Sequence, residues 1–78
     1  MNNIEKYKKI FAETFQLTEE TIENARLNVT SQWDSVGQMS LVTKLEEAFD
    51  VCFDFEDIIN MDSFESGKDI LRKYNVEF

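Results

Sequence analysis

The clearest alternation of apolar and polar residues lies in residues 33–50, WDSVGQMSLVTKLEEAFD. At about 100° per residue, six apolar side chains share one face: Met39, Leu41, Val42, Leu45, Ala48 and Phe49. The opposite face is polar and carries Ser40, Thr43, Lys44, Glu47 and Asp50. This pattern predicts a helix with one side in a core and the other in solvent. Val36 lies outside the apolar face, so we expect it to be exposed and available to a partner.

A second apolar stripe comes earlier and predicts a first helix over about residues 3–16. Its core positions recur at helical spacing and are Ile4, Tyr7, Ile10, Phe11 and Phe15. The polar stretch 17–32 predicts a long connection, which ends at Trp33 as an anchor. Because structureless loops of this length are uncommon in compact domains, we expect its apolar residues to tie it down by packing: Leu17, Ile22, Leu27 and Val29.

The helical spacing breaks after Asp50, and residues 51–53 predict a short extended connector. Asp54 is placed to cap a brief helix, whose inward residues would be Ile58, Ile59 and Met61. The sequence SGKD at 66–69 predicts the start of a closing helix at Ser66, with Phe64 packed beneath it. The tail 75–78 is expected to fray.

The composition favours an all-α fold with a single domain spanning 1–78. The 78 residues include no Pro, two Gly and seven Phe, and 42% are hydrophobic, which suits helices around a compact core. A chain this small buries only about 60–65% of the surface that its unfolded form exposes, so a deep catalytic cleft is not expected. We predict a four-helix bundle with three main helices and one short helix.

The residues that usually carry catalysis or bind metal are scarce. With no His and one Cys, neither a zinc site nor a His-assisted nucleophile is expected, so we assign no catalytic or metal-binding residue. Cys52 is expected to be a small apolar residue near the core, and a lone Cys forms no internal disulfide. No run approaches the roughly 18 apolar residues of a membrane span, and the start lacks the apolar core of a signal peptide. These features predict a cytoplasmic monomer that does not insert into membranes.

The formal net charge of −8 is distributed unevenly along the chain. Residues 34–69 hold ten acidic and two basic residues, which give −8, while 1–33 contribute −1 and 70–78 contribute +1. Nucleic acid and anionic membranes are therefore disfavoured as partners. A partner with a basic patch would be steered to this part of the chain. The acidic candidates for contact are Glu46, Glu47, Asp54, Glu56 and Asp57, for each of which a solvated helix face is the alternative.

Two arrangements are open at the start of the helix in 33–50. Ser35 could be the N-cap, with Gln38 three residues later completing a capping box that serves only stability. Alternatively, Asp34 is the N-cap and Ser35 is the first helical residue, with its hydroxyl in solvent at the positive end of the helix. A phosphate group attached there would be favoured by the helix dipole and the free N–H groups.

The same helix resembles the second helix of acyl carrier proteins, whose motif is Asp-Ser-Leu. The resemblance rests on DSV at 34–36, followed by LV, LEE and FD, and WDSVGQ at 33–38 is similar to the variant Trp-Asp-Ser-Leu-Gly-His. It extends through FDFEDIINMDSF and KDIL to nearly the full chain. Three positions differ: Val36 replaces the usual Leu, Gln38 replaces His, and Ser40 stands where fatty-acid carriers often have an acidic residue.

This resemblance implies a freestanding acyl carrier protein rather than an enzyme. Ser35 would carry covalent 4'-phosphopantetheine, transferred from coenzyme A by a phosphopantetheinyl transferase that Asp34 helps to engage with its metal ion. The thiol of the arm would hold an acyl or related group as a thioester and present it to acyl-loading, modifying and acyl-transfer enzymes with basic docking patches. Val36 would keep the apolar contact of the usual Leu.

The cargo of such a carrier is left open by the sequence. Fatty-acid and polyketide biosynthesis are both compatible, and the WDSxG variant favours a dedicated pathway over housekeeping fatty-acid synthesis. Many carriers shield an acyl chain between helices, which here would use apolar faces containing Met39, Val42, Ile58 and Met61. The alternative function is an unmodified acidic helical interaction module, in which Ser35 is only a cap.

Overall fold

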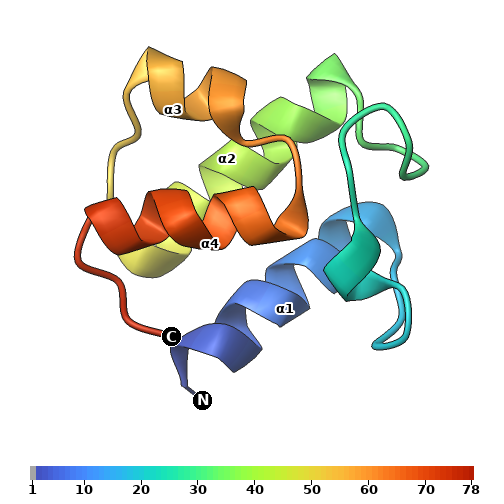
Figure 1. Cartoon of the computed structure of the whole chain (residues 1–78), viewed down its shortest axis with the longest axis horizontal. Coiled ribbons are helices and arrows are strands. Elements are labelled where there is room, and N and C mark those ends of the chain that lie inside the picture. The colour runs from blue at the N-terminus through green and yellow to red at the C-terminus, as the bar shows by residue number, and fades with distance from the viewer. Residues whose placement is uncertain (1) are drawn as a thin grey trace.

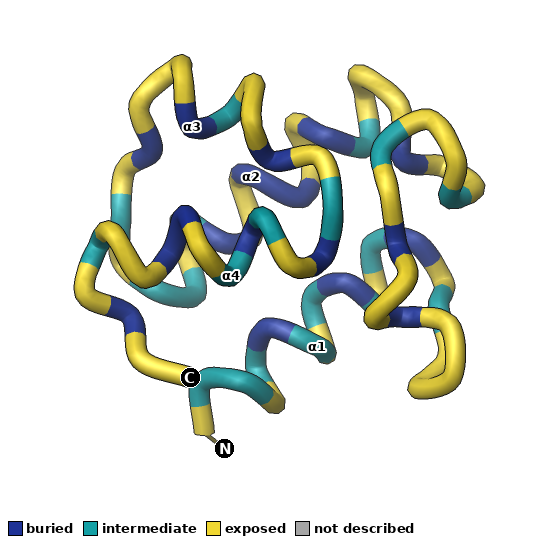
Figure 2. The backbone as a smooth tube through the Cα atoms, viewed as in Figure 1, coloured by how far each residue is buried: buried dark blue, intermediate teal, exposed yellow. Residues whose placement is uncertain are grey.

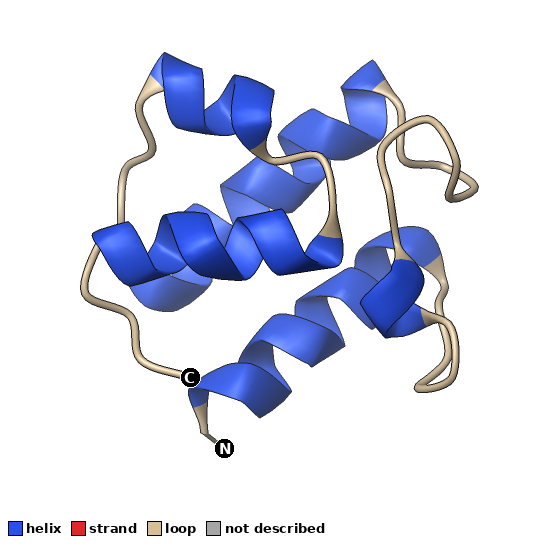
Figure 3. Cartoon of the chain, viewed as in Figure 1, coloured by secondary structure: helices blue, strands red, loops and turns tan. Residues whose placement is uncertain are grey.

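A computed structural model describes residues 2–78, and Figure 1 shows its helices in chain order. The elements are α1 (Asn3–Phe15), the 3-10 helix η1 (Ile22–Asn24), α2 (Ser35–Phe49), α3 (Phe55–Asn60) and α4 (Phe64–Lys73). Helices and loops make up the whole described chain, with no strand in it (Figure 3). The predicted all-α fold, with three longer helices and one short one, is confirmed. None of the helices within 2–78 has the length and apolarity to cross a membrane.

α1 supplies the aromatic part of the core. Its N-cap is Asn2, whose side chain accepts a hydrogen bond from the Glu5 N–H (2.9 Å), and its C-cap is Gln16, which has a left-handed conformation. Its inward side chains Tyr7, Phe11 and Phe15 are buried. In Figure 2 the buried stretches of α1, α2 and α4 alternate with exposed turns, as expected for helices that each bury one face.

The long connection between α1 and α2 is held by packing at some of the expected positions. Ile22 and Trp33 are buried, and Leu17 and Leu27 are partly buried against the core. Val29 was expected to pack as well, but 77% of it is exposed. The reason is a turn in which the Thr30 N–H donates to the Arg26 carbonyl (2.8 Å), so that Val29 lies on the outside of the turn.

Two further burial predictions are wrong. Cys52 is exposed, because the extended connector turns the neighbouring Phe53 inward instead. Successive side chains of an extended segment point in opposite directions. Ile59, expected to face inward from α3, is 58% exposed, whereas Met61 is fully buried.

The closing helix α4 begins earlier than predicted. Its N-cap is Ser63 rather than Ser66: Ser63 Oγ accepts from the Ser66 N–H (3.0 Å), and Ser66 Oγ accepts from the Ser63 N–H (2.9 Å). Ser66 therefore completes a capping box from inside the first turn. This start makes Phe64 the first helical residue, and its side chain is fully buried.

The tail after α4 packs against the bundle instead of fraying. Val76 is buried, and the Phe78 ring lies 5.4 Å from the Tyr7 ring and 6.3 Å from the Phe49 ring, centroid to centroid. The Asn3 side-chain amide donates to the Glu77 carbonyl (2.9 Å), which joins the two ends of the chain (Figure 1). Aromatic contact area, which the local sequence pattern does not reveal, holds this segment.

α3 is fastened at its start by side chains of α4 and the residue that follows it. Asp54 occupies the N-cap position without a side-chain capping bond, and its N–H donates to Tyr74 Oη (3.0 Å). Asp57 accepts hydrogen bonds from Lys73 Nζ (2.5 Å) and Tyr74 Oη (2.6 Å). Asp57 was expected to be an exposed partner contact, but only 5% of it is exposed. Its carboxylate is occupied within the molecule, which corrects that assignment.

We expect Asp57→Asn to destabilise the protein at neutral pH and to lose this effect in acid. The hydrogen bond from Lys73, followed by that from Tyr74, lowers the pKa of Asp57 below its ordinary value of 3.8. A carboxyl with a lowered folded-state pKa stabilises the fold above its unfolded pKa and loses that contribution as the pH falls through the folded pKa. Thermal unfolding of both proteins between neutral and strongly acidic pH measures the difference.

The control for this series is Asp69→Asn, which removes an exposed carboxylate paired with Arg72 (2.7 Å). Exposed pairs contribute little, so this variant should follow the unchanged protein across the range. A melting-temperature difference for Asp57→Asn that is the same at neutral and acid pH would contradict the role given to the Asp57 carboxylate.

Candidate functional site

Asp34 is the N-cap of α2. Its carboxylate accepts hydrogen bonds from the Val36 N–H (3.1 Å) and the Gly37 N–H (3.0 Å), and its own backbone is extended. Ser35 is therefore the first helical residue, and the capping box with Ser35 as its cap is wrong. A carboxylate at this position satisfies two unpaired donors and suits the positive end of the helix.

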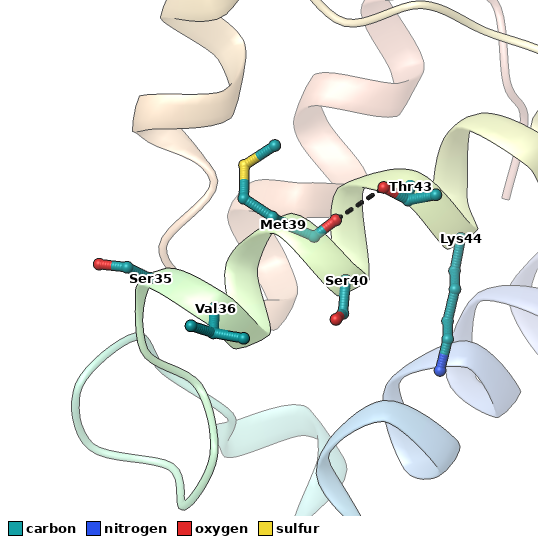
Figure 4. A pocket seen from close by; sticks show the side chains of 6 residues that line it. All are labelled: Ser35, Val36, Met39, Ser40, Thr43 and Lys44. Atoms are coloured by element: carbon teal, nitrogen blue, oxygen red, sulfur yellow. Dashed lines mark hydrogen bonds between the residues drawn. The ribbon is translucent and has the colours of Figure 1, made fainter.

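Ser35 is exposed at the beginning of α2, and its hydroxyl points outward from the helix (Figure 4). Because the chain contains no His, the usual partner that would activate a serine nucleophile is missing from it.

An open groove runs along the solvent side of α2 from Ser35 onward. Its lining residues are Ser35, Val36, Met39, Ser40, Thr43 and Lys44 (Figure 4). Val36 is 77% exposed, as predicted, and Met39, which was expected to face the core, is 54% exposed. The groove therefore presents an apolar strip beside the serine.

The orientation of α2 explains the exposure of Met39. At about 100° per residue, Met39 lies about 120° from Leu45, the centre of the buried face, whereas Gln38 lies only about 20° from it. The inward face consists of Gln38, Leu41, Val42 and Leu45. A polar residue thus takes the inward position in the first turn.

Gln38 joins three parts of the molecule. Its Oε1 accepts from Trp33 Nε1 (2.6 Å), and its Nε2 donates to the carbonyls of Ile58 (2.7 Å) and Met61 (2.9 Å). Only 8% of this residue is exposed. The sequence pattern indicated Gln38 as a possible capping partner and as the replacement for the His of the carrier variant, but it did not predict these hydrogen bonds. The Trp33 indole N–H, which needs an acceptor when buried, was the available signal.

Gly37 is required by close approach of the connection to α2. A Cβ at this position would collide with the Gln32 carbonyl oxygen and would lie 3.1 Å from the Phe15 ring. Gly in a helix interior lowers stability relative to Ala. Here the absence of a side chain allows the chain before Trp33 to pass close to the helix. Gly37 is a positioning residue that the sequence reasoning did not single out.

The acidic residues proposed for partner contact follow the groove. Glu47, Asp54 and Glu56 are exposed, whereas Glu46 is half-buried and accepts from the Phe53 N–H (2.9 Å). Between Ser35 and Leu45 there is no acidic residue. Beyond the cap, the groove therefore carries no negative charge and has Lys44 at its far end, and the acidic residues resume at Glu46, about three turns after Ser35. Within residues 2–78, no group of three or more Asp, Glu, Cys or His side chains is arranged to hold a metal ion.

We expect Asp34→Ala to lower the free energy of unfolding by about 0.5–2 kcal/mol, the usual cost of losing an N-cap side chain. Urea unfolding followed by circular dichroism measures this change. Glu47→Ala, which removes an exposed carboxylate from the same helix, is the matched control and should cost less. If Ser35→Ala lost this stability and Asp34→Ala did not, the assignment of the cap would be wrong.

Comparison with known proteins found a similar protein. The chain is 38% identical over 76 residues to a protein named acyl carrier protein from Buchnera aphidicola subsp. Baizongia pistaciae (strain Bp). The similarity covers 95% of this chain and 97% of that protein. No protein-family model matches the chain. No solved structure matches it significantly.

Proposed function

The chain belongs to the acyl carrier protein family, and from this premise we propose that Ser35 receives 4'-phosphopantetheine from coenzyme A and carries acyl or related groups as thioesters. A member of this family is a carrier and not an enzyme. The observation that supports the attachment site most strongly is the position of Ser35 as the exposed first residue of α2, with its hydroxyl directed outward.

The surroundings of Ser35 suit such an arm. The attached phosphate would lie at the positive end of α2, where the helix dipole favours an anion. The adjacent groove offers Val36 and Met39 for apolar contact with the arm or with a docked enzyme. In Asp34, the carboxylate that would engage the transferase and its metal ion also caps the helix, so it holds Ser35 in position.

In the transfer step this chain supplies only the nucleophile, Ser35 Oγ. A bond forms between Ser35 Oγ and the phosphorus next to pantetheine, and the bond from that phosphorus to the adenosine bisphosphate part of coenzyme A breaks. The transferase takes the hydroxyl proton. The thiol of the arm supplies the thioester chemistry when the group is bound.

Partner enzymes would dock on α2 and α3. We propose that they contact Val36 next to the arm and then reach the exposed acidic residues Glu47, Asp54 and Glu56, with the half-buried Glu46 at the edge. A basic patch on acyl-loading, modifying or acyl-transfer enzymes would complement this charge and speed their encounter. Tethering then converts a diffusive meeting between cargo and enzyme into a locally concentrated one.

Intact-protein mass spectrometry tests the proposal. The purified chain is incubated with coenzyme A, Mg²⁺ and a broad-specificity phosphopantetheinyl transferase, and a mass increase of one phosphopantetheine is expected. If several transferases left the folded protein unmodified, the unmodified acidic interaction module would become the better description.

A further inference from the structure

α3 is a short helix whose two ends are both held by side chains from outside it. Its start is fastened through Tyr74 Oη, which accepts from the Asp54 N–H (3.0 Å). Its end is fastened by Gln38 of α2, which donates to the carbonyls of Ile58 and Met61. Six residues form too short a helix to be stable in isolation, so these bonds fix its place beside α2.

Gln38 stands between Ser35 and the core. It lies three residues after Ser35, close to one helical turn, and it is directed inward where Ser35 is exposed. A chain tethered at Ser35 that turned into the space between α2 and the end of α3 would meet the Gln38 side chain first. The residues behind it are packed, because Leu41, Leu45 and Met61 are each fully buried.

We infer that Gln38 is a specificity-determining residue that keeps the tethered cargo outside the bundle, so that this carrier takes short or polar acyl groups. The inference rests on the proposed attachment at Ser35. It replaces the expectation that a chain is shielded between α2 and α3, for which Met39 was one of the lining residues and is in fact exposed.

The physical basis is the loss of hydrogen bonds and of core packing that insertion of a long acyl chain would cause. Moving Gln38 aside would break its three hydrogen bonds and leave the buried Trp33 indole N–H without an acceptor. Unsatisfied buried donors are costly. A packed core also has to expand to admit new methylene groups. A short or polar group gains little free energy from burial. It therefore cannot offset the lost hydrogen bonds and packing by entering the core.

The first experiment uses the unchanged protein loaded with acetyl or octanoyl groups from acetyl-coenzyme A and octanoyl-coenzyme A by a broad-specificity phosphopantetheinyl transferase. Methyl NMR spectra of the two forms are compared. We expect differences only at groove residues such as Val36 and Met39. Shifts at the buried Val42 and Met61 in the octanoyl form alone would overturn the inference, while leaving the carrier function intact.

The second experiment repeats this comparison in Gln38→Ala, with Ser40→Ala as the matched control on the exposed side of α2. Octanoyl loading is expected to shift the Val42 and Met61 signals and to raise the melting temperature in Gln38→Ala only. A folded Gln38→Ala whose core signals are the same with both cargoes would also overturn the inference. Should this variant not fold, the unchanged protein decides the question. Failure of loading itself would count against the attachment at Ser35 instead.

Discussion

Ser35→Ala is expected to stay folded and to accept no phosphopantetheine, the largest functional effect that we predict for one substitution. The substitution removes the hydroxyl on which the proposed attachment depends. Because Asp34 caps α2, the change in stability should remain within about 0.5 kcal/mol, as for ordinary surface substitutions. A folded protein without modification separates a role in attachment from a role in stability.

Ser40→Ala is the matched control for this variant. Ser40 is another exposed serine of α2 and lines the same groove. It should gain one phosphopantetheine as the unchanged protein does, measured by intact mass after incubation with transferase and coenzyme A. Full modification of Ser35→Ala would refute the attachment site, and modification lost in both variants would mean that the groove, rather than the Ser35 hydroxyl, was disturbed.

Trp33→Ala is expected to have the largest effect on stability. Trp33 is 1% exposed, stacks on Phe15 at 4.9 Å between ring centroids, and meets the Phe11 ring edge-on at 5.4 Å. Its indole N–H also donates to Gln38 (2.6 Å). Replacing a buried aromatic residue by Ala costs about 3–5 kcal/mol. Domains have about 0.05–0.15 kcal/mol of stability per residue, or about 4–12 kcal/mol for this chain.

The loss in Trp33→Ala therefore approaches the whole stability at the lower end of that range. Urea unfolding followed by circular dichroism measures it without relying on Trp fluorescence. Val29→Ala serves as the control, because Val29 is apolar but 77% exposed in the same connection; its change should stay within about 0.5 kcal/mol. A loss for Trp33→Ala no larger than that of the control would show that Trp33 does not anchor the connection.

The sequence by itself determined the fold class and pointed to Ser35 as the residue that we propose is modified. Helical spacing of Tyr7, Phe11 and Phe15 predicted α1 to within a residue of its observed end. Large aromatic side chains recurring on one face have no stable place other than a core, so this part of the pattern needs no tertiary information. The DSV string at 34–36 likewise marked the start of α2 and the exposed Val36.

Only the tertiary structure decided which residues of each helix face inward. Helical periodicity predicts only a wide apolar arc, and packing against neighbouring elements determines which part of that arc is buried. In α2, the hydrogen bonds of Gln38 with Trp33 and α3 hold Gln38 inward, and Met39 is left exposed in the groove. Asp57 looked like surface charge until Lys73 and Tyr74, distant in sequence, enclosed it. The choice between Asp34 and Ser35 as cap also lay beyond local pattern, because either side chain can satisfy the same N–H groups. Hydrogen bonds between residues distant in sequence depend on how the whole chain folds, so the local spacing of residues does not predict them.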